Sequence, residues 1–186
     1  INGIGSMDAT RETYLGSYLV ANAYRKAASE ADVVLSIGCK WDYTILYGAP
    51  PIWNQDQKVI QVDIDPEMIG RNRPVEVAIV GDAKTVINQL LSEMEDDLPK
   101  NKISEWQEWL EMLIELRKND ALAIDKILKY DKLPMKPERL SYEVLDFIEA
   151  DTQLVLDGGD IAVFTFGLLS NFPRDPKTLF YPISMG

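Results

Sequence analysis

Three short apolar runs in the first half of the chain have the pattern of buried strands. The runs "VVLSI", "KVIQVDI" and "VEVAIVG" cover residues 33–37, 58–64 and 75–81, and glycine or aspartate stands at or just after the end of each. Nearly continuous apolar runs of this length are typical of strands buried on both faces of a parallel sheet. We therefore predict a strand in each range, with unusual chemistry where the strands end.

Helical patterns fill the segments around these strands. Residues 17–30 are rich in alanine, and residues 103–128 predict a long helix with an apolar stripe of its own. Residues 82–96 give the clearest helix, because their apolar side chains recur at the i, i+3, i+4 and i+7 spacing of one face. Asp82 is a suitable N-cap for that helix. Its apolar face consists of Ala83, Val86, Ile87, Leu90, Leu91 and Met94.

A second alternation of elements occupies the last quarter of the chain. Residues 139–149 predict a helix, "QLVL" a strand, residues 160–171 a helix, and "TLFYPISMG" a last strand with its exit loop. Strands that alternate with helices in both blocks indicate an α/β fold with parallel sheets. The segment "KYDKLPMKPE" between the blocks has two prolines and several charges. We therefore predict domains at 1–128 and 139–186, joined by a linker at 129–138.

The composition excludes several classes of function. The 186 residues carry a net charge of -11, which argues against nucleic acid and anionic membrane surfaces as partners. No apolar run approaches the roughly 18 to 20 residues of a spanning helix, and we expect no secretory signal. Cys39 is the only cysteine, so we expect no internal disulfide and a cytoplasmic location. The absence of histidine excludes Ser-His and Cys-His catalysis and the usual zinc sites.

The ends of the first two strands carry the candidate binding residues. Ligands of open parallel sheets lie beyond the carboxyl ends of the strands. Gly38 and Lys40 follow the first strand, and Asp63 ends the second about 25 positions later, close to the ~20-residue gap of dinucleotide folds. A carboxylate at that place can accept two hydrogen bonds from a ribose diol. The alternative is that Asp63 accepts backbone N–H groups from a neighbouring loop, while Asp65 caps a helical turn that begins at Pro66.

A third strand end has a glycine turn. In "LDGGDIAVF", Gly158 and Gly159 form a turn that opens a helix, and Asp160 is the expected N-cap. The N–H groups at a helix start attract phosphate, but an acidic residue competes with an anion unless a metal intervenes. From these residues alone, a strand-turn-helix junction with a cap is the favoured interpretation.

The loop "YGAPPIWNQDQ" is broken by Pro50 and Pro51, which permit neither helix nor ladder. Aromatic residues flank this double proline and either line a pocket or pack the loop onto its sheet. These residues are Trp41, Tyr43, Tyr47 and Trp53.

Several of these segments resemble one enzyme family. "ADVVLSIGCKWD", "KVIQVDIDPEMIGRNRPVEVAIVGDAKTVINQLL" and the glycine-rich "INGIGS" are similar to the central domain of thiamine-diphosphate-dependent decarboxylases and carboligases, such as acetolactate synthase. "YGAPPIW" is more similar to the oxalyl-CoA decarboxylase and 2-hydroxyacyl-CoA lyase branch. "LVLDGGDIAVFTFGLL" to "YPISMG" resembles the start of the cofactor's diphosphate-binding domain. The resemblance covers most of the chain.

The resemblance implies a Rossmann-like, DHS-like NAD/FAD-binding fold for the first domain, with FAD or ADP as its ligand. By matching position, Gly38 and Lys40 would lie near the nucleotide phosphates, and relatives often have arginine in place of Lys40. Asp63 would bind the ribose, Ile64 would contact the adenine, and Asp82 would lie near it.

The second domain would approach thiamine diphosphate through Gly158, Gly159 and Asp160. Family members often have Gln-His at the last two positions, so binding through side chains would differ here. The family's catalytic glutamate and its Gly-Asp-Gly…Asn magnesium motif match no segment of this sequence. The first strands of the central domain are also expected before Ile1. The resemblance thus implies an inactive fragment with no catalytic or metal-binding residues of its own.

The parent enzyme would use thiamine diphosphate and Mg²⁺ to cleave or form a C–C bond in 2-keto acids or 2-hydroxyacyl compounds, with the cofactor ylid as nucleophile. Its partners would be the missing domains of the same protein and further copies in a dimer or tetramer. The first alternative is a non-catalytic ADP- or FAD-binding module with a regulatory or assembly role. The second is an α/β domain without a ligand.

Overall fold

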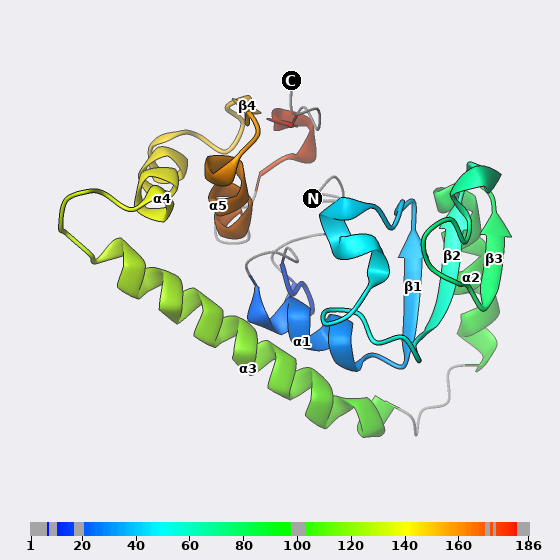
Figure 1. Cartoon of the computed structure of the whole chain (residues 1–186). Helices are drawn as coiled ribbons and strands as arrows, with labels where there is room; N and C mark the ends of the chain where they lie inside the picture. Colours follow the sequence, from blue (N-terminus) through cyan, green and yellow to red (C-terminus); the bar gives the residue numbers. More distant parts are fainter. Residues whose placement is uncertain are drawn as a thin grey trace. The chain divides into compact units, whose positions relative to one another are not determined.

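A computed structural model shows the chain as two compact units (Figure 1). It describes residues 7, 11–16, 21–97, 103–169, 172 and 174–181. One unit is Lys26–Trp109, and the other combines Ile1–Arg25 with Leu110–Gly186. This division is not the sequence boundary at 129–138, which stays a prediction. The "INGIGS" segment and residues 182–186 lie outside the described residues.

The first unit contains a three-stranded parallel sheet in the order β1-β2-β3. The strands are β1 (Val33–Ile37), β2 (Lys58–Asp63) and β3 (Val77–Val80), which confirms the three predicted strands, the first with its predicted bounds and the other two with shorter ones. The register pairs Ile37 with Val62, and Val62 with Ile79. Because the strands are parallel and in this register, their carboxyl ends meet at one edge of the sheet.

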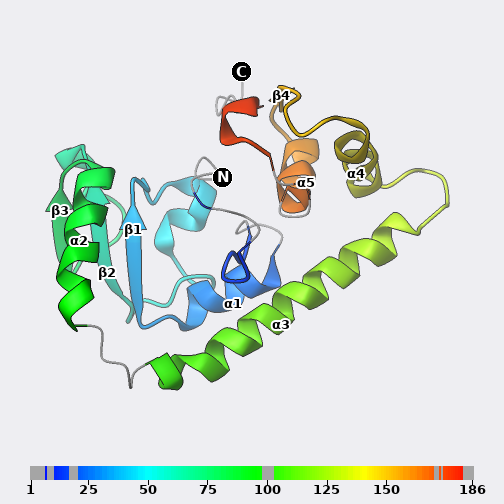
Figure 2. The same ribbon diagram turned by 180° about the vertical axis from the view of Figure 1, so that it is seen from behind.

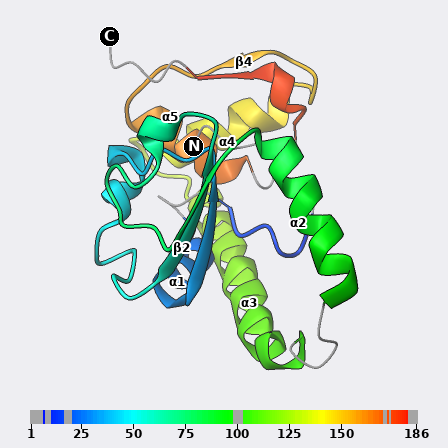
Figure 3. The same cartoon turned by 90° about the vertical axis from the view of Figure 1, so that its right-hand side faces the viewer.

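The central strand β2 forms the core of this sheet. Val59, Gln61, Val62 and Asp63 are all buried, which fits a strand flanked on both edges and covered on both faces. Helix α2 (Ala83–Asp97) lies against the sheet face that is turned away in Figure 1 and toward the viewer in Figure 2. Figure 3 shows the 41–57 segment on the opposite side of the sheet. The sheet therefore has helix α2 on one face and, on the other, a segment that contains the short 3-10 helix η1 (Tyr43–Gly48).

Helix α2 begins where the sequence predicts, but most of its apolar face is not buried. The side chain of Val86 is buried, whereas those of Ile87, Leu91 and Met94 are exposed. The i, i+3, i+4 spacing correctly placed these residues on one side of a helix. The three-stranded sheet buries only the part of that side that lies over β2.

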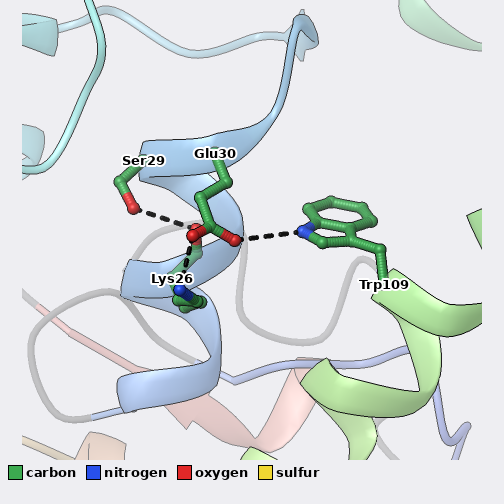
Figure 4. A network of polar contacts seen from close by, with 4 residues as sticks. All are labelled: Lys26, Ser29, Glu30 and Trp109. Atoms are coloured by element: carbon green, nitrogen blue, oxygen red, sulfur yellow. Dashed lines mark hydrogen bonds and ion pairs between the residues drawn. The ribbon is translucent and has the colours of Figure 1, made fainter.

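A polar network ties two distant segments of the first unit together (Figure 4). Lys26 and Glu30 form an i, i+4 ion pair on α1 (Asn22–Glu30), and Ser29 Oγ donates to the Lys26 carbonyl at 3.0 Å. Trp109 Nε1, from α3 (Ile103–Leu128), donates to Glu30 Oε2 at 3.3 Å. The hydrogen bond from Lys26 holds the pKa of Glu30 below its ordinary value, and the Trp109 bond acts in the same direction.

The second unit contains α4 (Pro137–Phe147), β4 (Leu154–Val155), α5 (Asp160–Leu168) and β5 (Leu179–Phe180). β4 and β5 pair in parallel, so both blocks have the predicted α/β character. Asp120 of α3 accepts hydrogen bonds from the Asn22 side chain at 2.6 Å and from the Ala23 N–H at 3.1 Å, at the start of α1. The small core of this unit consists of Leu145, Leu156, Ala162, Phe166, Leu168 and Leu169.

Within the described ranges, no helix combines the length and the apolarity needed to span a membrane.

Candidate nucleotide-binding site

The loops after β1, β2 and β3 lie together at the carboxyl edge of the sheet. The Gly38 N–H donates to the Val62 carbonyl at 2.8 Å, and the Gly81 N–H donates to the Asp63 carbonyl at 2.9 Å. These bonds continue the parallel ladder one residue past each outer strand. The segments that contain Lys40, Asp63 and Asp82 are therefore brought to one edge, which is where open parallel sheets bind ligands.

Asp63 is the buried acid of this edge, with 8% of its surface exposed. Its Oδ1 accepts the Asp65 N–H at 3.0 Å, so the alternative of a loop-bracing carboxylate is correct for one oxygen. No described residue donates to Oδ2, and no described cation forms an ion pair with Asp63. One carboxylate oxygen therefore remains for a donor that comes from outside the described chain.

The loop after β1 leaves space beside this acid. Gly38 has φ +61°, a conformation that L side chains rarely adopt, and a Cβ at this position would have no atom within 4 Å. Lys40 is exposed, and among the described residues it has no ion-pair partner. An open backbone followed by an unpaired cation is suited to a phosphate group.

Ile64 and Asp82 complete the set of predicted nucleotide residues. Ile64 follows Asp63 directly and is 73% exposed, so an apolar surface stands next to the buried acid. Asp82 caps α2: its Oδ1 accepts the Thr85 N–H at 2.9 Å and the Thr85 hydroxyl at 3.0 Å. The backbone bond lowers the pKa of Asp82, and the hydroxyl bond lowers it further. The capping role of Asp82 is thus confirmed, and a role in ligand binding stays a prediction.

The turn after β2 has the predicted cap. Asp65 Oδ1 accepts the Glu67 N–H at 3.0 Å at the start of a 3-10 turn, Pro66–Met68. Pro66 occupies the first position of that turn and Gly70, with φ +68°, follows its end. The two aspartates at this strand end therefore have separate tasks, since Asp65 caps and Asp63 faces the sheet edge.

Gln61, which the sequence pattern did not single out, connects the loops that form the candidate site. Gln61 is fully buried in β2, and its side chain bonds to the loop after β1 and to the loop after β2. A glutamine inside the apolar run "KVIQVDI" was the available signal, because a buried amide needs specific partners. The sequence alone does not say which loops provide them.

The two tryptophans of the aromatic loop pack against each other and do not face the candidate site as a group. Trp41 and Trp53 are buried and meet edge to face, with ring centroids 4.9 Å apart. The guanidinium of Arg73, another residue that the sequence pattern did not single out, lies 5.3 Å from the centroid of the Trp41 ring. Tyr43 and Tyr47 are exposed, so the four aromatic residues do not line one pocket. The interpretation of loop packing holds for the tryptophans only.

The third predicted strand end belongs to the second unit. Gly159, with φ +83°, is the N-cap residue of α5, and Asp160 is the first residue of the helix, so the predicted Asp160 cap is wrong. Gly159 takes the cap position because it can adopt the left-handed conformation that turns the chain into the helix. Asp157 Oδ1 accepts the Gly158 N–H at 2.7 Å, and a Cβ at either glycine would meet nothing within 4 Å. The turn therefore has space for a ligand, but its charged side chains, Asp157 and Asp160, are both acidic.

Comparison with known proteins identifies the first half of the chain. Residues 1–90 match the family described as the thiamine pyrophosphate enzyme central domain. The β1 and β2 loops of the candidate site lie within these residues, so the edge that holds Gly38, Asp63 and Ile64 is in the part of the chain that is similar to a thiamine pyrophosphate enzyme central domain.

Individual relatives have several activities. A probable acetolactate synthase large subunit from Methanococcus aeolicus is 32% identical over 65% of this chain and 20% of that protein. Human 2-hydroxyacyl-CoA lyase 1 is 30% identical over 84% of the chain and 27% of its own length. A sulfoacetaldehyde acetyltransferase from Roseovarius nubinhibens is 42% identical over 42% of the chain and 13% of that protein. The aligned parts are about a quarter or less of each of these relatives.

Proposed function

We propose that the carboxyl edge of the three-stranded sheet binds an adenine nucleotide, either ADP or FAD. The observation that carries this proposal is the free Oδ2 of Asp63, a buried carboxylate without a cation partner in the described chain. Oδ2 is not one of the buried side-chain atoms without a partner, so it is open to a ligand, and the two hydroxyls of a ribose are donors that a carboxylate oxygen can accept. Gly38 and Lys40 would then face the phosphates, and the exposed Ile64 would contact the adenine ring.

We also propose that the whole protein is a thiamine-diphosphate-dependent enzyme that forms or cleaves a C–C bond in a 2-keto acid or a 2-hydroxyacyl compound. The family of residues 1–90 and the names of the relatives support this proposal. Neither the family nor the names of the relatives decides whether the enzyme is a transferase or a lyase. The proposal includes Mg²⁺, the domains that the longer relatives possess, a dimer or tetramer, and a cytoplasmic location suited to a single cysteine.

The described residues do not fit a complete thiamine diphosphate site. The open turn at Gly158 and Gly159 offers N–H groups to a diphosphate, but the exposed Asp160 repels an anion that lacks a metal. Among the described residues, no group of three or more Cys, Asp or Glu side chains could hold a metal ion. We therefore assign no reaction step to this chain and propose that the catalytic groups come from the rest of the protein.

The nucleotide proposal is tested by calorimetric titration of ADP and, separately, FAD into the 186-residue chain. We expect saturable binding of at least one of them with a stoichiometry of about one. Guanosine diphosphate is the matched control, because it retains the ribose and the phosphates but replaces adenine with another ring. Absence of binding for both ADP and FAD would refute the nucleotide site and favour an α/β domain without this ligand. Binding of ADP by a whole protein that has no thiamine-dependent activity would favour the regulatory or assembly module.

A further inference from the structure

The side chain of Gln61 connects the two loops that form the candidate nucleotide site. Its Nε2 donates to the Cys39 carbonyl at 3.3 Å and to the Met68 carbonyl at 3.1 Å. Its Oε1 accepts the Gly70 N–H at 2.9 Å. Both N–H groups of the amide are thus used, one on each loop. The side chain is fully buried, so water does not compete for these bonds.

The two loops contact different parts of the proposed ligand. Cys39 lies between Gly38 and Lys40, which would face the phosphates. Met68 and Gly70 end the short turn that starts beside Asp63, which would bind the ribose. A change in the separation of these loops would therefore change the distance between the phosphate-binding and the ribose-binding groups.

We propose that Gln61 is a positioning residue that sets this separation for a nucleotide diphosphate. The inference rests on the proposed nucleotide function and deepens it. Gln61 touches no ligand atom in this proposal, since it acts through the backbone of Cys39, Met68 and Gly70. Replacing Gln61 lowers the affinity for a ligand that contacts both loops, such as ADP, more than the affinity for one that contacts only the ribose side, such as adenosine.

A merely structural role predicts a different result. If Gln61 only stabilised the fold, its replacement would lower the unfolding temperature and weaken ADP and adenosine by the same factor. The ratio of the ADP and adenosine affinities separates the two roles, because adenosine has no phosphate to hold against the loop at 38–40.

Gln57, which immediately precedes the same strand, is a matched control. It is also a buried glutamine, and its Nε2 donates to the Ala28 carbonyl at 2.6 Å. Its Oε1 accepts from Arg73 Nη2 at 3.2 Å. It precedes the first residue of β2, so its contacts lie at the amino ends of the strands, away from the candidate site. Gln57→Leu removes the same chemical group with the same change of side chain.

The experiment titrates ADP and adenosine into the wild-type chain, Gln61→Leu and Gln57→Leu, with adenosine measured by displacement of ADP. FAD replaces ADP if only the flavin binds. We expect Gln61→Leu to lower the ratio of ADP to adenosine affinity at least about tenfold, the effect of roughly one hydrogen bond to a charged group. Gln57→Leu lowers the unfolding temperature and leaves the ratio unchanged. Gln61→Asn retains the amide on a shorter stem and gives a smaller decrease in the same ratio, which preserves the test if the leucine variant does not fold.

Equal weakening of ADP and adenosine in both Gln61 variants would overturn the positioning role while leaving the nucleotide site intact. An equal fall of the ratio in Gln57→Leu would also overturn it, because any buried defect would then have the same effect. A wild-type chain that binds neither ADP nor FAD would refute the proposed function itself, and the role of Gln61 with it.

Discussion

Replacing Asp63 with asparagine removes the charge of the buried acid and retains its shape. Asparagine can still accept the Asp65 N–H through its amide oxygen, which is the one hydrogen bond that the Asp63 side chain makes with the described residues. The amide NH₂ group then occupies the place of Oδ2. It presents a donor to the donating hydroxyls of a ribose, so the ligand loses an acceptor.

The size of the effect follows from the one free oxygen. A hydrogen bond to a charged group contributes about 1.5 to 3 kcal/mol. Because 1.4 kcal/mol corresponds to a factor of ten, we expect ADP to bind about 10- to 150-fold more weakly. A carboxylate with both oxygens free would predict a larger loss. The bond from Asp65 therefore sets the upper end of this range.

Calorimetric titration of ADP into wild type, Asp63→Asn and Asp65→Asn measures this loss. Asp65→Asn is the control, because asparagine is about as good an N-cap as aspartate and the bond to Glu67 persists. Asp63→Asn should not lower the free energy of unfolding, although it lowers the affinity for ADP. Asp63→Asn should leave that free energy unchanged or raise it, since it removes a buried charge with no cation partner among the described residues. Equal ADP affinity in all three proteins would show that Asp63 only braces its loop.

Four further predictions concern other parts of the chain. Gly48→Ala should lower the free energy of unfolding in urea by about 2 to 4 kcal/mol, because Gly48 has φ +70° and a Cβ would lie 2.6 Å from Trp41; no loss would contradict this packing. The lowered pKa of Glu30 means that its bond with Lys26 contributes stability above the ordinary glutamate pKa, and this contribution is lost as the pH falls through the folded-state pKa. The difference in unfolding temperature between wild type and Glu30→Gln should accordingly shrink on acidification, and a constant difference would count against it. Limited proteolysis should cut first within 129–138, and an earlier cut elsewhere would argue against a linker there. The chain should not turn over pyruvate with added thiamine diphosphate and Mg²⁺, and any turnover would refute the proposal that its catalytic groups lie elsewhere.

The strands and the caps formed by Asp65 and Asp82 could be predicted because their signals are local. The run that forms β2 is apolar at most positions, and its neighbours Asp65 and Pro66 have the preferences of a cap and a first helical position. The common edge of the sheet follows from parallel pairing alone. The strands and these caps depend on residues that are near one another in sequence, so a single sequence contains the information.

The connections between loops could not be predicted, because they depend on tertiary structure. Gln61 reaches the Cys39 carbonyl 22 positions earlier, and Arg73 bonds to the Gly48 carbonyl 25 positions earlier. Long polar side chains on such residues are usually solvent-exposed, and no local pattern marks these two as buried. The left-handed conformations of Leu46 and Tyr47 were also unpredictable, since non-glycine residues rarely adopt them.

The uncovered face of α2 has a practical consequence for handling this chain. The apolar side chains of Ile87, Leu91 and Met94 are exposed to solvent, and so are those of Leu35 and Val77 in the outer strands. Each copy of the chain carries a net charge of -11, and the electrostatic repulsion between copies opposes their aggregation. Acid lowers the negative charge and concentrated salt screens it, but neither changes the exposed apolar surface. The preparation is therefore most prone to precipitate under these two conditions, and neutral buffers of low ionic strength suit it best.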